Sequence, residues 1–163
     1  MALTINGTTS GVSLKTDTSN IGLGANAVDS ITTGDYNVGL GDHAGTAITT
    51  GSYNTAVGSD ALKTNNTGST NDAFGYYALQ ANTTGSQNVA IGSRSLSSNT
   101  TASDNTAVGR DSLKANTTGA GNTSIGVASL DANTTGSTNT AVGKNSLSAN
   151  TTASNNTAVG RDA

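Results

Sequence analysis

The 163-residue sequence contains no cysteine, no proline and no tryptophan, and it has a single histidine. The absence of cysteine excludes disulfides, thiolate zinc sites and cysteine nucleophiles. One histidine and ten carboxylates scattered along the chain leave little material for acid–base catalysis or for a metal site. We therefore expect no catalytic residues, no metal and no cofactor, and the chain is predicted not to be an enzyme.

Charge and long apolar runs are scarce as well. Seven Lys and Arg residues and a net charge of −3 do not provide the basic surface that a nucleic-acid partner requires. No apolar run approaches the ~20 residues of a membrane-spanning helix. Residues 1–20 lack the basic segment followed by an apolar segment that marks a signal peptide. We expect neither nucleic-acid binding nor membrane insertion.

Large apolar residues are few, with Leu, Ile, Val and Phe contributing 26 residues, while Thr, Asn and Gly contribute 70. Such a composition is typical of disordered chains, because too little apolar surface offsets the conformational entropy of folding. The low net charge and the absence of proline do not fit disorder. The chain is therefore either a low-complexity linker or a fold whose core is built in an unusual way.

An internal repeat decides between these two alternatives. The pentapeptide Asn-Thr-Ala-Val-Gly at residues 54–58 has counterparts every 17 residues, from residues 20–24 to residues 156–160. The nine unit starts keep strict register without any insertion or deletion. A stack of coils demands such a register, because one extra residue would turn side chains to the wrong face. The sequence therefore predicts an all-β fold, a parallel β-solenoid or β-roll of stacked 17-residue coils.

Four positions of the unit carry the pattern. Position 1 is a predicted structural row of asparagines: Asn20, Asn37, Asn54, Asn71, Asn88, Asn105, Asn122, Asn139 and Asn156. Position 5 is a predicted structural row of glycines: Gly24, Gly41, Gly58, Gly75, Gly92, Gly109, Gly126, Gly143 and Gly160. Position 4 is large and apolar, and we predict that it lies in the core: Leu23, Leu40, Val57, Phe74, Ile91, Val108, Ile125, Val142 and Val159. Position 9 is predicted as core in the regular units: Leu62, Leu79, Leu96, Leu113, Leu130 and Leu147.

Each part of the unit has a local structural preference. Thr-Ala-Val at positions 2–4 favours a short strand, and the glycine at position 5 ends it. Thr-Thr-Gly-Ser at positions 13–16 favours a turn. The asparagines of position 1 are expected to stack as an amide ladder with a spacing of ~4.8 Å. Positions 6–11 are compatible with a second short strand, the preferred assignment, and also with one helical turn.

The chain divides into residues 1–19, a β-rich leader or attachment segment outside the register, and residues 20–163, the repeat domain. The first two units carry Ile31 and Ile48 at position 12 in place of asparagine, as expected of units that cap a stack. The ninth unit stops part-way through a coil, so we expect that the natural protein continues or that a partner covers this end.

The predicted core is thin for a single chain. Each coil offers two sizeable apolar side chains, which is little hydrophobic burial against the entropy of ordering 17 residues. Association of copies around a shared axis would bury more surface. A three-fold arrangement is the simplest choice, although the sequence does not fix the number of chains.

Units of the form Asn-Thr-Ala-Val-Gly-x-x-Ala-Leu-x-x-Asn-Thr-Thr-Gly resemble the repeats of phage tail-fibre proteins, which often precede an endosialidase-type chaperone domain. They are also similar to the head repeats of YadA-type trimeric autotransporter adhesins. The resemblance covers residues 20–163. The 17-residue period is longer than the typical adhesin head repeat, and this sequence contains neither a chaperone domain nor a membrane anchor.

The resemblance implies a homotrimeric, fibrous, parallel β structure on a virion or on a cell surface. Because residues 1–20 do not resemble a signal peptide, we expect a phage virion structural protein, a tail-fibre shaft segment with a role in host attachment. The expected partners are other copies of the chain, other virion proteins through the N-terminal region, and a host surface glycan or receptor. The alternative is the head domain of a bacterial surface adhesin that binds host glycans or matrix.

Several isolated features have a structural explanation that we prefer to a functional one. His43 has no recurring partners for a metal site, so a solvated or capping role is expected. Asn-x-Thr sequences such as residues 82–84 occur at one repeat position, which favours turn and ladder chemistry over glycosylation. Adjacent threonines at positions 13 and 14 would face opposite ways in a strand, which disfavours ice binding. Four tyrosines are predicted to pack against an attachment partner, in preference to forming a glycan-binding platform: Tyr36, Tyr53, Tyr76 and Tyr77.

Overall fold

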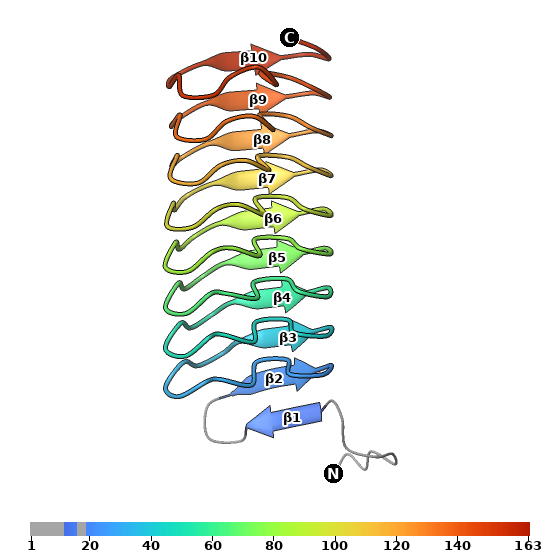
Figure 1. The fold of residues 1–163 in the computed structure, drawn as a ribbon, viewed down its shortest axis with the longest axis vertical. Coiled ribbons are helices and arrows are strands. Elements are labelled where there is room, and N and C mark those ends of the chain that lie inside the picture. Colours follow the sequence, from blue (N-terminus) through green and yellow to red (C-terminus); the bar gives the residue numbers. More distant parts are fainter. Residues whose placement is uncertain (1–11, 16–18) are drawn as a thin grey trace.

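The computed structural model describes residues 12–15 and 19–163. These residues form one sheet of ten strands that stack in chain order along a column (Figure 1). The strands are β1 (Val12–Lys15), β2 (Asn20–Leu23), β3 (Val38–Leu40), β4 (Thr55–Val57), β5 (Asp72–Phe74), β6 (Val89–Ile91), β7 (Thr106–Val108), β8 (Thr123–Ile125), β9 (Thr140–Val142) and β10 (Thr157–Val159). The described residues contain no helix.

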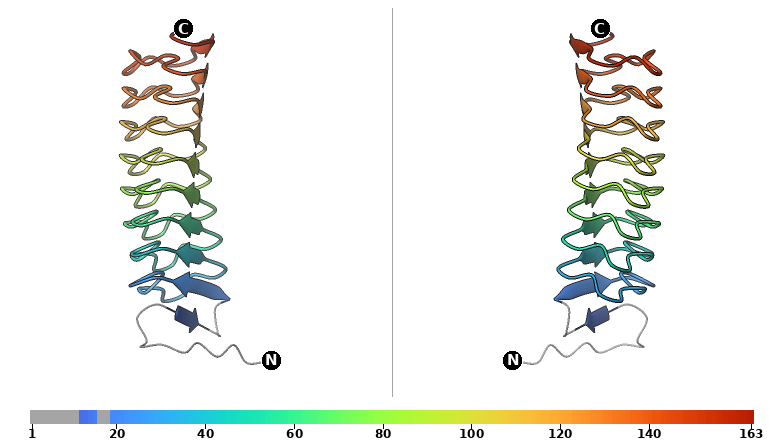
Figure 2. Two further views of the ribbon diagram at one scale, coloured as in Figure 1. Left: turned by 90° about the vertical axis from the view of Figure 1, so that its right-hand side faces the viewer. Right: turned by 90° about the vertical axis from the view of Figure 1, so that its left-hand side faces the viewer.

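Strands β2 to β10 are parallel, and each strand residue pairs with the residue 17 positions further along the chain. Ala56 pairs with Ala73, and Ala73 pairs with Ala90. Each 17-residue unit is therefore one coil with one strand, which confirms the predicted all-β fold and its parallel β-solenoid of stacked coils. Seen edge-on, the strands lie along one side of the column and the turns along the other (Figure 2).

Strand β1 differs from the other strands because it is antiparallel to its neighbour. Val12 lies opposite Leu23, and Lys15 lies opposite Asn20. The strand therefore covers the first edge of the parallel sheet, which would otherwise present unpaired backbone groups. It belongs to the predicted leader, whose residues 1–11 and 16–18 lie outside the described residues.

Positions 6–11 of each coil form consecutive turns, so the second strand and the alternative helical turn are both wrong. In each of the eight complete coils the residues at positions 7 and 9 have positive φ, for example Asp60 (58°) and Leu62 (50°). Helices and strands both need a run of residues with negative φ, and two left-handed residues per coil prevent either. The backbone groups are satisfied between coils, since Asp60 N–H donates to Asp42 O (2.9 Å) and Leu62 N–H to Ala78 O (3.0 Å).

The interior of the regular coils is filled by the leucines of position 9 and by small residues at positions 3 and 8, such as Ala56 and Ala61. The predicted core leucines Leu62, Leu79, Leu96, Leu113 and Leu130 are fully buried, and Leu147 packs against them partly buried. Position 9 therefore forms the continuous apolar column that the sequence predicts.

The residues of position 4, also predicted as core, lie on the outside of the chain, so that prediction is wrong for a single copy. Leu23, Phe74, Ile91, Ile125 and Val159 are 40–71% exposed, and Leu40, Val57, Val108 and Val142 are half-buried. Successive side chains of a strand face opposite sides of a sheet. Position 3 faces inward, where the position-9 leucine of the regular coils leaves room only for a small side chain. Position 4 must therefore face outward.

Candidate functional site

The asparagines of position 1 form a continuous amide ladder inside the column, from Asn20 to Asn156. Asn54 donates its backbone N–H and its Nδ2 group to Asn37 Oδ1, both at 3.0 Å. The same Nδ2 donates to the carbonyl of Gly68 in its own coil at 2.9 Å. Each amide therefore bonds one coil to the next and also holds the turn at position 15. Because these buried polar groups are satisfied, they stabilise the stack.

A second amide ladder runs through position 12 of the regular coils, from Asn65 to Asn150. Asn82 donates through Nδ2 to Asn65 Oδ1 at 2.7 Å and to the carbonyl of Gly85 at 2.8 Å. Asn82 is fully buried. Its Asn-Thr-Thr sequence is therefore part of the ladder, as predicted, and not an accessible glycosylation acceptor.

The glycines of position 5 allow the coils to approach one another closely. Gly58 has a φ of +126°, a backbone conformation that side chains rarely adopt, and an added Cβ would lie 2.7 Å from the carbonyl carbon and oxygen of Gly75. Only a residue without Cβ fits such a contact. This row therefore ends each strand, as the sequence predicts, and it also sets the backbone contact between coils.

The outer side of the sheet is formed by positions 2 and 4 of each coil. Asp72 is the single charged residue among these eighteen positions, and Thr occupies position 2 in five coils. All other described charges lie elsewhere on the column. The outer face therefore carries almost no charge, and its position-4 row is apolar without interruption from β2 to β10.

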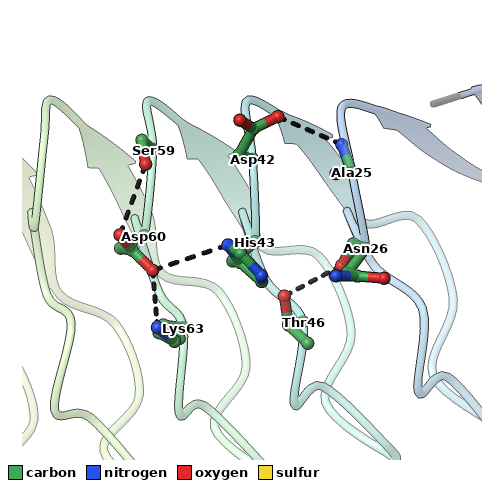
Figure 3. A network of polar contacts seen from close by, with 8 residues as sticks. All are labelled: Ala25, Asn26, Asp42, His43, Thr46, Ser59, Asp60 and Lys63. Carbon is green, nitrogen blue, oxygen red and sulfur yellow. Dashed lines mark hydrogen bonds and ion pairs between the residues drawn. The ribbon is translucent and has the colours of Figure 1, made fainter. Parts of the chain in front are cut away.

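Most charged side chains of the repeats, all except Asp35, Asp72 and Asp104, lie just after the glycine turn, at positions 6, 7 and 10. Asp60 Oδ1 lies 2.7 Å from Lys63 Nζ and 3.9 Å from His43 Nδ1, and Ser59 Oγ donates to Asp60 Oδ2 at 3.3 Å (Figure 3). The hydrogen bond from Lys63 lowers the pKa of Asp60 below its ordinary value, against the opposing effect of desolvation. His43 is thus a half-exposed side chain beside a carboxylate of the next coil, which agrees with its predicted capping or solvated role.

A second cluster repeats this arrangement three coils later. Arg94 Nε lies 2.8 Å from Asp111 Oδ1, and Arg110 Nη1 lies 2.7 Å from Asp111 Oδ2. Asn145 Nδ2 donates to Asp162 Oδ1 at 2.8 Å after three further coils. Each contact at position 7 joins two adjacent coils, so these pairs favour the correct stacking register.

The tyrosines form two separate stacked pairs. The rings of Tyr36 and Tyr53 lie 5.0 Å apart at position 17 of the first two coils, with more than half of each side chain exposed. The rings of Tyr76 and Tyr77 lie 3.9 Å apart in the turn after β5. The four tyrosines therefore form two separate aromatic pairs and not one continuous surface.

The threonines of positions 13 and 14 play different parts. Thr83 Oγ1 donates to the carbonyl of Thr100 at 3.0 Å, and Thr100 Oγ1 donates to the carbonyl of Thr117 at 3.1 Å. Thr84 and its equivalents at position 14 are exposed. The hydroxyls of position 13 are thus used to join coils, and the two rows do not form the hydroxyl array that ice binding would need.

Among residues 12–15 and 19–163, no group of three or more His, Cys, Asp or Glu residues is placed to hold a metal ion. No helix in the described part of the chain is long and apolar enough to cross a membrane. Comparisons with protein-family models, with curated proteins and with solved structures give no match.

Sequence reasoning located the ladders and the glycine row but missed the outward direction of position 4. A signal for it is present in the sequence. Position 3 never exceeds serine in size, which is the mark of a tightly packed site, whereas position 4 varies from valine to phenylalanine. Such variation indicates a surface that is not enclosed within one coil.

Proposed function

We propose that this chain is a non-enzymatic structural segment of a phage virion, a homotrimeric fibre shaft that holds a host-attachment device away from the particle. The observation that carries the proposal is the unbroken bonding between coils. A backbone ladder and the position-1 amide ladder join every neighbouring pair from the first coil to the ninth. The position-12 ladder joins the regular coils as well.

This bonding gives the column stiffness along its axis. Eight steps of ~4.8 Å place the first and last parallel strands about 38 Å apart. Bending the column would lengthen hydrogen bonds on one side of many coils at once, and the buried amides have no water to replace them. Rigidity and spacing are properties that a projecting shaft needs, and they require no reactive group.

The proposed localisation is the tail or another surface fibre of the virion. In this proposal residues 1–19 attach the shaft to other virion proteins, and the far end serves contact with a host surface glycan or receptor. The trimer is supported by the exposed apolar row of position 4, which three copies around a shared axis would cover.

A second candidate function is the head domain of a bacterial surface adhesin. The exposed stack of Tyr36 and Tyr53 favours it, because an exposed aromatic ring offers an apolar face to which the C–H groups of a sugar bind. The pair is confined to the first two coils, whereas the ladders extend over the whole column. We therefore rank the shaft above the adhesin.

Mass spectrometry of purified phage particles and of the surface fraction of the host bacteria tests the proposal. We expect peptides of the chain in particles purified on a density gradient, together with peptides of the capsid protein. Peptides confined to the bacterial surface fraction would favour the adhesin, and peptides found only in the cytosol would overturn both functions.

A further inference from the structure

The two rows on the outer side of the sheet differ in chemistry. Position 4 is apolar in all nine coils, from Leu23 to Val159. Position 2 is polar in six coils, with five threonines and Asp72. All six Lys and Arg residues of the repeat domain lie after the glycine turn, away from this face. An apolar row beside a partly polar row matches the centre and the rim of a protein–protein interface.

We propose that copies of this chain contact one another through this face, parallel and in register, with position 4 at the centre of the contact and position 2 at its rim. The inference rests on the proposed shaft function, in which all copies must point the same way, and it identifies the surface through which they associate. Each coil then meets the same coil of the other copies, so that Ile125 packs against its own counterparts.

The exposed area of the face is sufficient for a stable interface. Phe74 is 40% exposed, which corresponds to roughly 80 Å² of an aromatic side chain. With roughly 50 Å² for each of the eighteen outward side chains, the face offers about 900 Å² per copy, against about 800 Å² per partner in a standard interface. Since the face bears a single charge, burying it requires little desolvation of ionised groups.

A second copy is the occupant that matches the face along its whole length. The outward rows repeat once per coil, ~4.8 Å apart, and another copy presents the same spacing at every coil. The largest pairs stand at the first coils, with Ile21 beside Leu23, and the last coil has Thr157 beside Val159. A parallel arrangement brings the most apolar coils together, whereas an antiparallel one would place them against threonines.

Charge substitution on this face tests the contact. The variant Val57→Asp/Ile125→Asp places two carboxylates in the position-4 row, four coils apart. The matched control Thr70→Asp/Thr138→Asp places two carboxylates four coils apart at position 17, where Asp104 occurs naturally. Sedimentation equilibrium gives the mass of each, and circular dichroism checks that each is folded.

We expect the unsubstituted chain and the position-17 control to sediment as oligomers. The Val57→Asp/Ile125→Asp variant should sediment as a folded monomer, because an unpaired carboxylate buried in a contact raises the dissociation constant by roughly 100-fold or more. If this variant keeps the mass of the unsubstituted chain, the face is not the contact, although the shaft function stands. A folded monomer for the unsubstituted chain overturns both the contact and the trimer.

Single substitutions within β8 test the assignment of centre and rim. We expect Ile125→Asp to raise the dissociation constant at least tenfold more than Thr123→Asp, because a rim carboxylate stays hydrated, as Asp72 does in this arrangement. Equal effects, or a larger effect of Thr123→Asp, would overturn the assignment of position 4 to the centre.

Cysteine cross-linking tests the direction of the copies, since the chain has no cysteine of its own. In the parallel arrangement Thr140→Cys chains cross-link to one another through a short bis-maleimide. In an antiparallel arrangement, coil eight faces coil two, and Thr140→Cys would cross-link only when mixed with Val38→Cys. That second result would overturn the parallel register.

Discussion

In the first two coils, residues 20–53, the interior is filled by Val28, Ile31 and Ile48, whereas in the next six coils it is filled by leucine at position 9 and asparagine at position 12. Both regions keep the 17-residue coil, the position-1 amide ladder and the glycine of position 5. They differ at position 12, where the first two coils have isoleucine in place of asparagine, and at position 9, where they have Val28 and Gly45 in place of leucine.

The small residues of the first two coils show why this exchange is possible. An added Cβ at Gly45, the position-9 residue of the second coil, would lie 2.9 Å from Ile48 Cδ1 and 3.2 Å from Val28 Cγ1. An added Cβ at Gly39 would lie 3.0 Å from Val28 Cγ1. The isoleucine and valine side chains therefore occupy the space that leucine and alanine occupy in regular coils. A coil therefore has a fixed interior volume, which the side chains of position 9 or position 12 can fill.

The largest effect is expected at the glycine that both regions share. Gly41→Ala and Gly109→Ala should each destabilise the fold by about 3–5 kcal/mol, because the new Cβ meets the backbone of the next coil and the φ near +130° is strained. Urea unfolding at fixed chain concentration measures the free energy. Gly121→Ala is the control, since its φ is also positive (+68°) but an added Cβ would come no closer than 3.4 Å to its neighbours, and it should cost only about 1–2 kcal/mol. If Gly109→Ala left the free energy of unfolding unchanged, the close contact between the backbones of neighbouring coils would be contradicted.

The next largest effect is expected from emptying the interior. Leu96→Ala and Ile48→Ala should each cost about 2–5 kcal/mol, because each leaves a cavity in a closed coil. Thr101→Ala, exposed in the same coil as Leu96, should change the free energy of unfolding by less than about 0.5 kcal/mol. If Ile48→Ala proved as mild as Thr101→Ala, the isoleucine would not be the equivalent of the leucine.

A smaller effect is expected from the ladder that only the regular coils possess. Asn99→Ala removes the donor of Asn82 Oδ1, and the acceptor left unsatisfied should cost about 1–3 kcal/mol. Asn66→Thr is the control, because Asn66 stands at position 13, where seven other coils have threonine. Equal thermal midpoints for the two variants would show that the position-12 ladder contributes no stability.

The smallest effect is expected at the ion pair of Asp60 and Lys63. The lowered pKa of Asp60 means that the pair stabilises the fold above the ordinary value of 3.8, and that this contribution is lost as the pH falls through the lowered pKa. Lys63→Met should cost at most about 1 kcal/mol at pH 7, because Lys63 is partly exposed. At acidic pH, the unfolding midpoint of Lys63→Met should approach the unfolding midpoint of the unsubstituted chain. Lys114→Met serves as the control. If its loss of stability depended on pH in the same way, the effect could not be assigned to the ion pair of Asp60 and Lys63.

The period, the strands, the glycine row and the first ladder could be predicted because each depends on residues that recur every 17 positions. The inside and outside of the strand could not be assigned with the same certainty, since Ala56 and Val57 are both apolar and alternation alone does not say which faces inward. Hydrophobicity alone favours Val57 as the inward-facing residue, but the interior of the narrow coil has room only for the smaller Ala56.

The turns at positions 6–11 were beyond sequence reasoning for a different reason. Asp adopts positive φ more readily than most residues, but leucine does not, and the fully buried Leu62 in the left-handed region is imposed by the stacking of coils on both sides. Local preference was overridden by contacts between coils, which a single unit of sequence does not contain.

A double-mutant cycle in the third coil tests most directly whether one interior volume can be filled from either position. The variant L62G/N65I recreates in this coil the glycine and isoleucine of the second coil, and each single substitution serves as its own reference. We predict that the double variant loses at least about 1 kcal/mol less than the sum of the two single losses, because the isoleucine fills the space that the leucine leaves. Losses that add, or a double variant worse than the sum, would contradict a shared interior volume.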